Sequence, residues 1–183
     1  MGIFDRLKDR KKLKGRVFED ELLYLKKYHK DVELVSCQIE NITELPESWK
    51  KIFCMSSKEE KIAETIKCWK ALFANELRNT IQYLEENLVD VNLIRYRGKC
   101  AILYYILSAH KEVLYYEGGN CNTTHFPDKL QFELNKIPSS IVKFYRELHN
   151  GFFYYASGSM GLLESNDIVA FDDEEWGVLD ELA

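Results

Sequence analysis

Residues 137–155 read IPSSIVKFYRELHNGFFYY, and this stretch carries the strongest indication of the fold. Pro138 suits the first turn of a helix, because a helix needs no N–H donor at that position. The apolar residues that follow form one face of this helix. Asn150-Gly151 ends it, since glycine adopts a left-handed conformation without strain. Aromatic residues 152–155 then predict a β-strand.

The segments on either side extend this pattern. Leu130, Phe132 and Leu134 alternate with polar residues, which predicts a half-buried strand before the helix. Downstream, residues 157–159 predict a tight turn. Two apolar segments follow, at 160–163 and 167–171, before an acidic run that ends at Trp176.

Residues 57–88 predict a long helix or a pair of helices. Ser57 and Glu60 have the spacing of a capping box, which satisfies two free backbone donors at a helix start. Apolar residues then recur at helical spacing, with Asn75 as a possible break. Earlier in the chain, residues 19–29 predict a short helix. Pro46 predicts the first turn of another, with Trp49, Ile52 and Phe53 facing inward.

Residues 91–117 have two interpretations. Residues 101–107 form a continuous apolar run, whose type periodicity does not decide. Their β-branched and aromatic content favours a strand that returns at 113–116 as a β-meander. The alternative is helical, because Asp90-Val91-Asn92, Gly98 and the residues around 110–114 resemble an ankyrin repeat. That resemblance covers residues 76–122, whereas a stable array needs about three repeats.

Charge is distributed unevenly over the 183 residues, although the net charge is only -5. Residues 1–16 carry seven bases and two acids and predict a short basic helix. Residues 151–183 carry eight acids and no base. This balance argues against direct binding of nucleic acid, which requires a basic face that displaces counterions. It favours a basic partner.

The cysteines and the apolar runs exclude several classes of protein. The spacing of the five cysteines matches neither a disulfide framework nor a zinc site, which indicates free thiols in a reducing compartment. No apolar run reaches the roughly 18 residues of a membrane span, and the N-terminus lacks the apolar core of a signal peptide. We therefore expect a cytoplasmic protein.

The C-terminal third resembles the SUKH superfamily, also called the Smi–Knr group. The shared features are an Ile-Pro helix start, an aromatic-rich helix, an Asn-Gly end followed by a strand, a Gly-Leu segment and an apolar segment before an acidic stretch. The matching parts are Ile137-Pro138, Phe144-Tyr145, Asn150-Gly151, Gly161-Leu162-Leu163 and Ile168. The resemblance covers about a quarter of the chain.

Together these features predict an α+β fold. We expect a mainly helical region at 1–90, and a SUKH-like region at 91–183 that contains an antiparallel or mixed sheet. The two regions could also form one continuous domain.

The resemblance implies binding to a partner protein rather than catalysis. Bacterial members of the superfamily are chiefly immunity proteins, which neutralise a partner toxin that is often a nuclease. An acidic inhibitor would be steered to the basic face of such a nuclease. A general interaction or scaffold module with ankyrin-like helices is the alternative. The residues expected to contact the partner are Tyr154, Tyr155, Glu164, Asp167, Asp172, Asp173, Glu174, Glu175 and Trp176.

No catalytic motif occurs in the sequence. It contains no Gly-rich phosphate loop, no nucleophile elbow and no metal-ligand cluster, so we predict no catalytic residue, no cofactor and no metal. The remaining enzymatic alternative is a divalent cation bound by the carboxylates of residues 172–175. Consecutive acids on a loop usually point apart, which disfavours that alternative.

Overall fold

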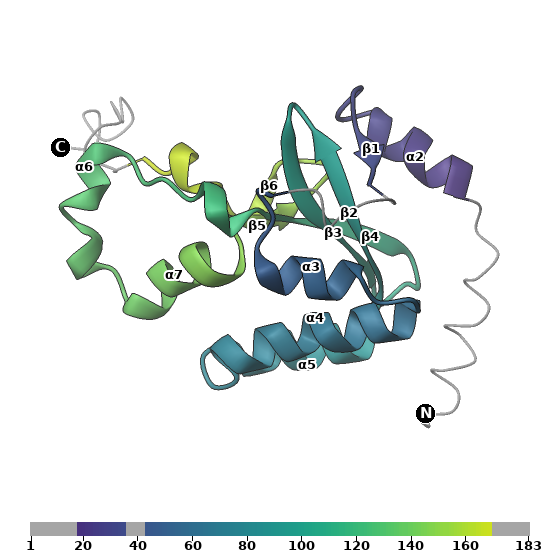
Figure 1. Ribbon diagram of the computed structural model, residues 1–183, viewed down its shortest axis with the longest axis horizontal. Helices are drawn as coiled ribbons and strands as arrows, with labels where there is room; N and C mark the ends of the chain where they lie inside the picture. The colour runs from purple at the N-terminus through teal and green to yellow at the C-terminus, as the bar shows by residue number, and fades with distance from the viewer. Residues whose placement is uncertain (1–17, 36–42, 170–183) are drawn as a thin grey trace, which may run out of the picture.

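The structure, a computed structural model, describes residues 18–35 and 43–169. It confirms the predicted α+β class: helices cover a six-stranded antiparallel sheet (Figure 1). The α-helices are α2 (Phe18–Lys26), α3 (Glu47–Phe53), α4 (Lys58–Phe73), α5 (Arg78–Asn87), α6 (Asp128–Gln131) and α7 (Ser139–Lys143). The strands are β1 (Glu33–Leu34), β2 (Leu88–Tyr96), β3 (Lys99–Leu107), β4 (Val113–Gly119), β5 (Phe152–Tyr154) and β6 (Ser159–Leu162).

Strand order in the sheet follows the order in the sequence, from β1 at one edge to β6 at the other. All neighbouring strands are antiparallel. Between β2 and β3 the chain reverses at Arg97 and Gly98, whose φ angles are 49° and 74°. Two positive φ angles in succession match the right-handed twist of a hairpin. The β2–β3–β4 meander is the centre of the sheet.

Two hydrophobic clusters cover the two faces of this meander. Ile102 and Tyr104 of β3 face the first cluster, which α3, α4 and α5 cover (Figure 1). Leu103 and Tyr105 face the second cluster, to which α2 contributes Leu25. A strand buried on both faces has no polar side to alternate with. This explains the continuous apolar run at 101–107 and settles its type as a strand.

The ankyrin-like interpretation of residues 76–122 is wrong. Residues 88–119 form three long antiparallel strands rather than helices. The helix that precedes them, α5, packs against the first hydrophobic cluster through Ile81 and Leu84. The β-branched and aromatic residues of this region are therefore used in a sheet, as their strand preference indicates.

Residues 57–88 form a pair of helices, one of the two arrangements predicted. Ser57 Oγ accepts a hydrogen bond from the Glu60 backbone N–H at 3.1 Å, and the Glu60 carboxylate accepts one from the Ser57 N–H at 3.1 Å. This is the predicted capping box. Helix α4 ends at Phe73 and α5 begins at Arg78, so the break includes Asn75.

The strand predicted at Leu130, Phe132 and Leu134 does not form. Residues 128–131 are helix α6, and Leu134–Lys136 is a 3-10 turn. Pro127 precedes the first turn of α6, where its fixed φ favours a helix. Phe132 is 82 % exposed. The alternating pattern fails here because no described strand lies beside it to complete a ladder.

The stretch 137–155 folds largely as predicted. Pro138 precedes α7, and α7 continues into a π-helical turn at Phe144–Leu148. The helix ends at Leu148, and Gly151, with a φ of 85°, lies directly before β5. A Cβ at Gly151 would lie 2.8 Å from the Leu163 carbonyl oxygen, so glycine is required for space as well as for conformation.

Other predictions concern smaller features. Trp49, Ile52 and Phe53 of α3 are buried, as expected. The cysteines at 54, 68, 100 and 121 are free thiols, and Cys54 is exposed rather than buried. The predicted basic helix at 1–16 and the acidic run after residue 169 lie outside the described residues. In the parts of the chain that the structure describes, no helix has the length and apolar character needed to cross a membrane.

Candidate partner-binding surface

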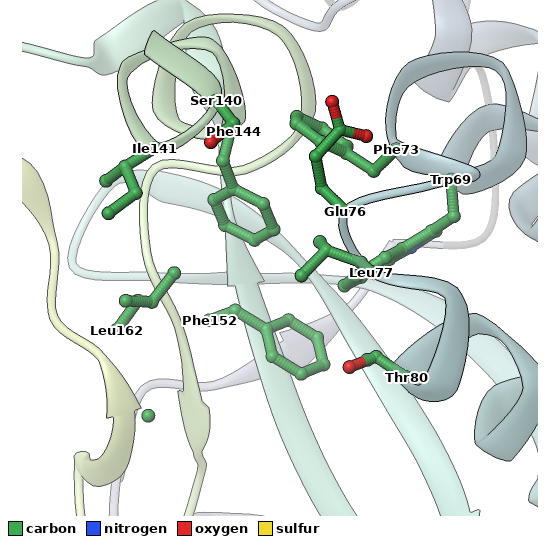
Figure 2. Close-up of a pocket in the computed structure, with 11 residues that line it drawn as sticks. Trp69, Phe73, Glu76, Leu77, Thr80, Ser140, Ile141, Phe144, Phe152 and Leu162 are labelled. Atoms are coloured by element: carbon green, nitrogen blue, oxygen red, sulfur yellow. The ribbon is translucent and has the colours of Figure 1, made fainter. Parts of the chain in front are cut away.

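The helical layer leaves an apolar groove at the β6 end of the sheet. Its volume is about 320 Å³, and its walls come from α4, α5, α7, the π-helical turn, β5 and β6. Figure 2 shows the side chains of Leu77, Phe144, Phe152 and Leu162 arranged around the hollow. The lining residues are Trp69, Phe73, Glu76, Leu77, Thr80, Ser140, Ile141, Phe144, Phe152, Gly161 and Leu162.

The floor of this groove is held by a buried hydrogen-bond chain. Trp69 Nε1–H donates to the Tyr104 hydroxyl at 3.1 Å, and Tyr104 lies 2.6 Å from His149 Nε2. The indole N–H can only donate, so the Tyr104 oxygen accepts it, and the same hydroxyl shares a second hydrogen bond with His149, whose direction depends on the imidazole tautomer. Removing any member leaves buried polar groups unpaired, so the chain holds the aromatic rings of the floor in fixed orientations.

The imidazole of His149 is neutral in this series of hydrogen bonds. Its complete burial lowers its pKa to about 3, because a buried imidazolium would lose its hydration. The rings of Trp69 and Phe152 lie 5.8 and 5.9 Å from the imidazole. A Cβ at Gly118 would approach the imidazole ring to 2.6 Å, so the strand beneath it requires glycine. The floor is therefore tightly packed and uncharged at neutral pH.

A second apolar groove lies on the other side of α7, with a volume of about 360 Å³. Ile141, Gly161 and Leu162 line both grooves, so the two grooves adjoin at α7 and β6. The second groove also includes Tyr145 and residues at the end of the described chain, Ile168 and Val169.

Exposed apolar side chains gather around these grooves. Met160 is 74 % exposed and Leu162 is 40 % exposed, although both belong to a strand of the sheet. Ile141 on α7 and Leu163 after β6 are exposed to a similar degree. Among the described strands, β6 pairs only with β5, so no described strand lies along its outer edge. Contiguous exposed apolar residues with a free strand edge are typical of a protein-binding surface.

The charged side chains that line the two grooves are acidic. Glu76 is the one charged side chain among the described residues that line the first groove, and Asp167 lies at the second. The elements around the first groove also carry two bases, Arg78 at the start of α5 and Lys143 at the end of α7. The Lys143 ammonium donates to the Leu72 carbonyl at 3.2 Å and lies 5.5 Å from the centre of the Phe73 ring. The ammonium group of Lys143 therefore contacts α4.

The residues predicted to contact a partner divide into three groups. Glu164 and Asp167 lie after β6, where Lys99 pairs with Glu164 at 2.7 Å. Tyr154 is half-buried on β5 and lies opposite Tyr116 of β4. The residues at 172–176 lie outside the described residues.

Tyr155 is a core residue, which corrects its assignment to a binding surface. Only 1 % of it is exposed, and its hydroxyl donates to the Leu25 carbonyl at 3.3 Å. The sequence could not separate it from Tyr154, because neighbouring residues of a strand point to opposite faces and either face could be the buried one.

The residues of the first groove were not predicted as a site. Trp69 and Phe73 belong to the apolar repeat of residues 57–88, a pattern that predicts a core-facing side of a helix, and both are buried. Their role in a groove arises because the end of α4, the start of α7 and β6 meet there without filling the space. No local pattern in the sequence encodes such a gap.

A polar hollow lies on the opposite face of the sheet. Its volume is about 320 Å³, and His29, Tyr96 and Lys99 are among the residues that line it. The Tyr96 hydroxyl donates to Glu117 Oε1 at 2.6 Å, while Glu117 Oε2 finds no hydrogen-bond partner among the described residues. Burial raises the pKa of Glu117 to about 7, although the Tyr96 hydrogen bond opposes that increase.

The described residues contain no cluster of side chains that could bind a metal ion. Within residues 18–35 and 43–169, no three histidine, cysteine, aspartate or glutamate side chains lie where they could share a metal ion. The carboxylates at 172–175, which the cation alternative invoked, lie outside these ranges.

Comparison with known proteins gives no relative. No protein-family model matches the chain, and neither the curated protein sequences nor the solved structures include a significant match to it.

Proposed function

We propose that this protein is a cytoplasmic immunity protein of the SUKH type, which binds a basic toxin domain and neutralises it without catalysis. The partner would be a nuclease-type toxin, whose nucleic-acid-binding face is basic. The protein would cover that face and keep nucleic acid out.

The observation that carries this proposal is the combination of apolar exposure and acidity at one end of the chain. Met160, Leu162 and Leu163 are exposed around open apolar grooves. They belong to residues 151–183, which contain eight acids and no Lys, Arg or His. Apolar residues exclude water at the centre of an interface, while complementary charge accelerates association and selects the partner.

The α+β architecture supports the same proposal. The helix start after Pro138, the helical segment with Phe144 and Tyr145, the Asn-Gly reversal and the following strand occur in the order that the SUKH resemblance implies. In addition, the buried hydrogen-bond chain beneath the groove fixes its shape before binding. A preformed site loses less conformational entropy when the partner binds.

The test is co-expression with the toxin domains encoded beside its gene. We expect one of them to lose its toxicity and to form a 1:1 complex, with an affinity that falls as salt is raised from about 0.05 to 0.5 M. An equally basic toxin domain from an unrelated pair serves as the control for non-specific attraction. If no adjacent toxin is encoded, or none is bound and neutralised, the proposal fails.

A further inference from the structure

We infer that the groove between α4, α5, α7 and β6 receives one aromatic or large aliphatic side chain of the basic partner, flanked by a lysine or arginine that pairs with Glu76. This inference rests on the proposed function and specifies the chemistry of the partner at one place on its surface. The groove is the hydrophobic centre of the interface, and Glu76 lies among its lining residues.

The lining of the groove fits an apolar side chain rather than a polar cofactor. A volume of about 320 Å³ lies at the lower end of the roughly 300–1,000 Å³ of small-molecule sites. Only Glu76, Thr80 and Ser140 bring polar side chains to the lining. A phosphate or a sugar would find few donors there. An apolar anchor would bury its surface against Leu77, Phe144 and the other apolar walls (Figure 2).

The aromatic walls are arranged to accept another ring. Trp69 contacts Phe152 edge-to-face with ring centroids 5.4 Å apart, and it contacts Phe144 similarly at 5.8 Å. Edge-to-face packing is a preferred geometry of aromatic pairs, so an incoming ring extends the same arrangement. The Tyr104–His149 hydrogen bond prevents the floor from collapsing to fill the space.

Charge selects a basic flank for the anchor. Glu76 is exposed on the turn between α4 and α5 and is the sole charged side chain among the described lining residues. The nearby Lys143 ammonium donates to Leu72 rather than to Glu76. A lysine or arginine next to the anchor would place its positive charge at Glu76, whereas an acidic flank would be repelled.

The second groove does not support an equally specific inference. Its lining includes Ile168 and Val169, directly before the residues that lie outside the description. All residues that line the first groove are described, so the inference is confined to it.

The test uses the full-length chain and the toxin domain that the co-expression experiment finds to be neutralised. Leu162→Arg places a cation in the groove at a residue that is 40 % exposed in the free protein. We expect the dissociation constant to rise about 30-fold, as for a central interface anchor. Ile141→Arg approaches the same groove from α7 and provides an independent variant. The matched control is Leu23→Arg on α2, where the leucine is 63 % exposed on the other side of the sheet.

The charge is tested separately with Glu76→Lys. We expect the association rate at low salt to fall about fivefold, because electrostatic steering acts mainly on that rate. Glu112→Lys, at an exposed position between β3 and β4, makes the same change in net charge away from the groove. We expect it to change the rate by less than about twofold.

The outcomes separate this inference from the proposed function. If wild-type protein binds and Leu162→Arg and Ile141→Arg, both folded by circular dichroism, bind equally well, the groove inference is overturned while the function stands. If wild-type protein binds no toxin, both fail. If wild-type protein alone forms dimers that Leu162→Arg abolishes, a second copy of this chain occupies the groove and the inference is again overturned.

Discussion

The two faces of the sheet bury different ionisable groups, His149 on one and Glu117 on the other. His149 lies under the helical layer, with its imidazole bonded to Tyr104 and surrounded by aromatic rings. Glu117 lies in the second hydrophobic cluster, with one oxygen bonded to Tyr96 and the other without a partner among the described residues. Burial therefore favours the neutral form on both faces, with opposite consequences for the pH dependence of stability.

The two signs follow from linkage. The unfolded chain protonates a histidine near pH 6.5, whereas folded His149 accepts a proton only near pH 3, so its contribution to stability is lost as pH falls below 6.5. The unfolded chain ionises a glutamate near pH 4.5, whereas folded Glu117 keeps its proton to about pH 7. The Glu117 contribution is thus lost as pH rises from 4.5 to 7. Between pH 4.5 and 6.5 the two slopes oppose each other.

Among the variants that compare the two faces, Trp69→Ala is expected to reduce stability the most. It removes the donor at the start of the buried chain together with a large core side chain, and should lower the free energy of unfolding by about 3–5 kcal/mol at any pH. Urea denaturation measures this change. Leu23→Ala, at an exposed position, is the control and should change stability by less than about 0.5 kcal/mol. Similar losses for the two variants would contradict the assignment of Trp69 to the core.

Glu117→Gln is expected to remove the part of the pH dependence of stability that comes from Glu117, on the other face of the sheet. The pKa difference from 4.5 to about 7 corresponds to about 3 kcal/mol at about 1.4 kcal/mol per pH unit. Relative to pH 4.5, the variant should therefore lose about 3 kcal/mol less stability at pH 8 than the wild type does. Urea denaturation at a series of pH values measures the difference. Parallel curves for the two proteins would mean that Glu117 does not titrate in this range.

A matched pair of tyrosine variants compares the two hydrogen bonds directly. Tyr104→Phe leaves the Trp69 N–H and the His149 ring nitrogen unpaired, and should cost about 1–3 kcal/mol equally at pH 7 and pH 8.5. Tyr96→Phe should cost more at pH 8.5 than at pH 5, because only at the higher pH does its hydroxyl donate to a charged carboxylate. Equal costs for Tyr96→Phe at both pH values would refute this assignment.

Leu162→Arg is expected to have the smallest effect on folding. The side chain is partly exposed at the edge of the sheet, so stability should change by less than about 1 kcal/mol, measured by thermal or urea unfolding. Its effect should instead be seen in partner binding. A large loss of stability would show that the groove wall belongs to the core, and Ile141→Arg would then carry the binding test alone.

Local chemistry made much of the fold predictable. Three signals involve only a few neighbouring residues each and are therefore visible in the sequence. They are the capping box at Ser57 and Glu60, the proline before α7, and the apolar runs of β3 and β4. The failure at Leu130–Leu134 has an equally local origin. Alternation predicts a strand only where a neighbouring strand is available, and Pro127 favoured a helix instead.

The sequence by itself determined the α+β class, the capped helix that starts after Ser57, and the concentration of acidic residues after residue 150. The tertiary structure decided which side of each element is buried. It placed Tyr155 in the core, covered both faces of β3, and brought Trp69, Phe144 and Leu162 around one groove. Burial depends on contacts between residues far apart in the chain, and these contacts exist only once the helices and the sheet have packed together.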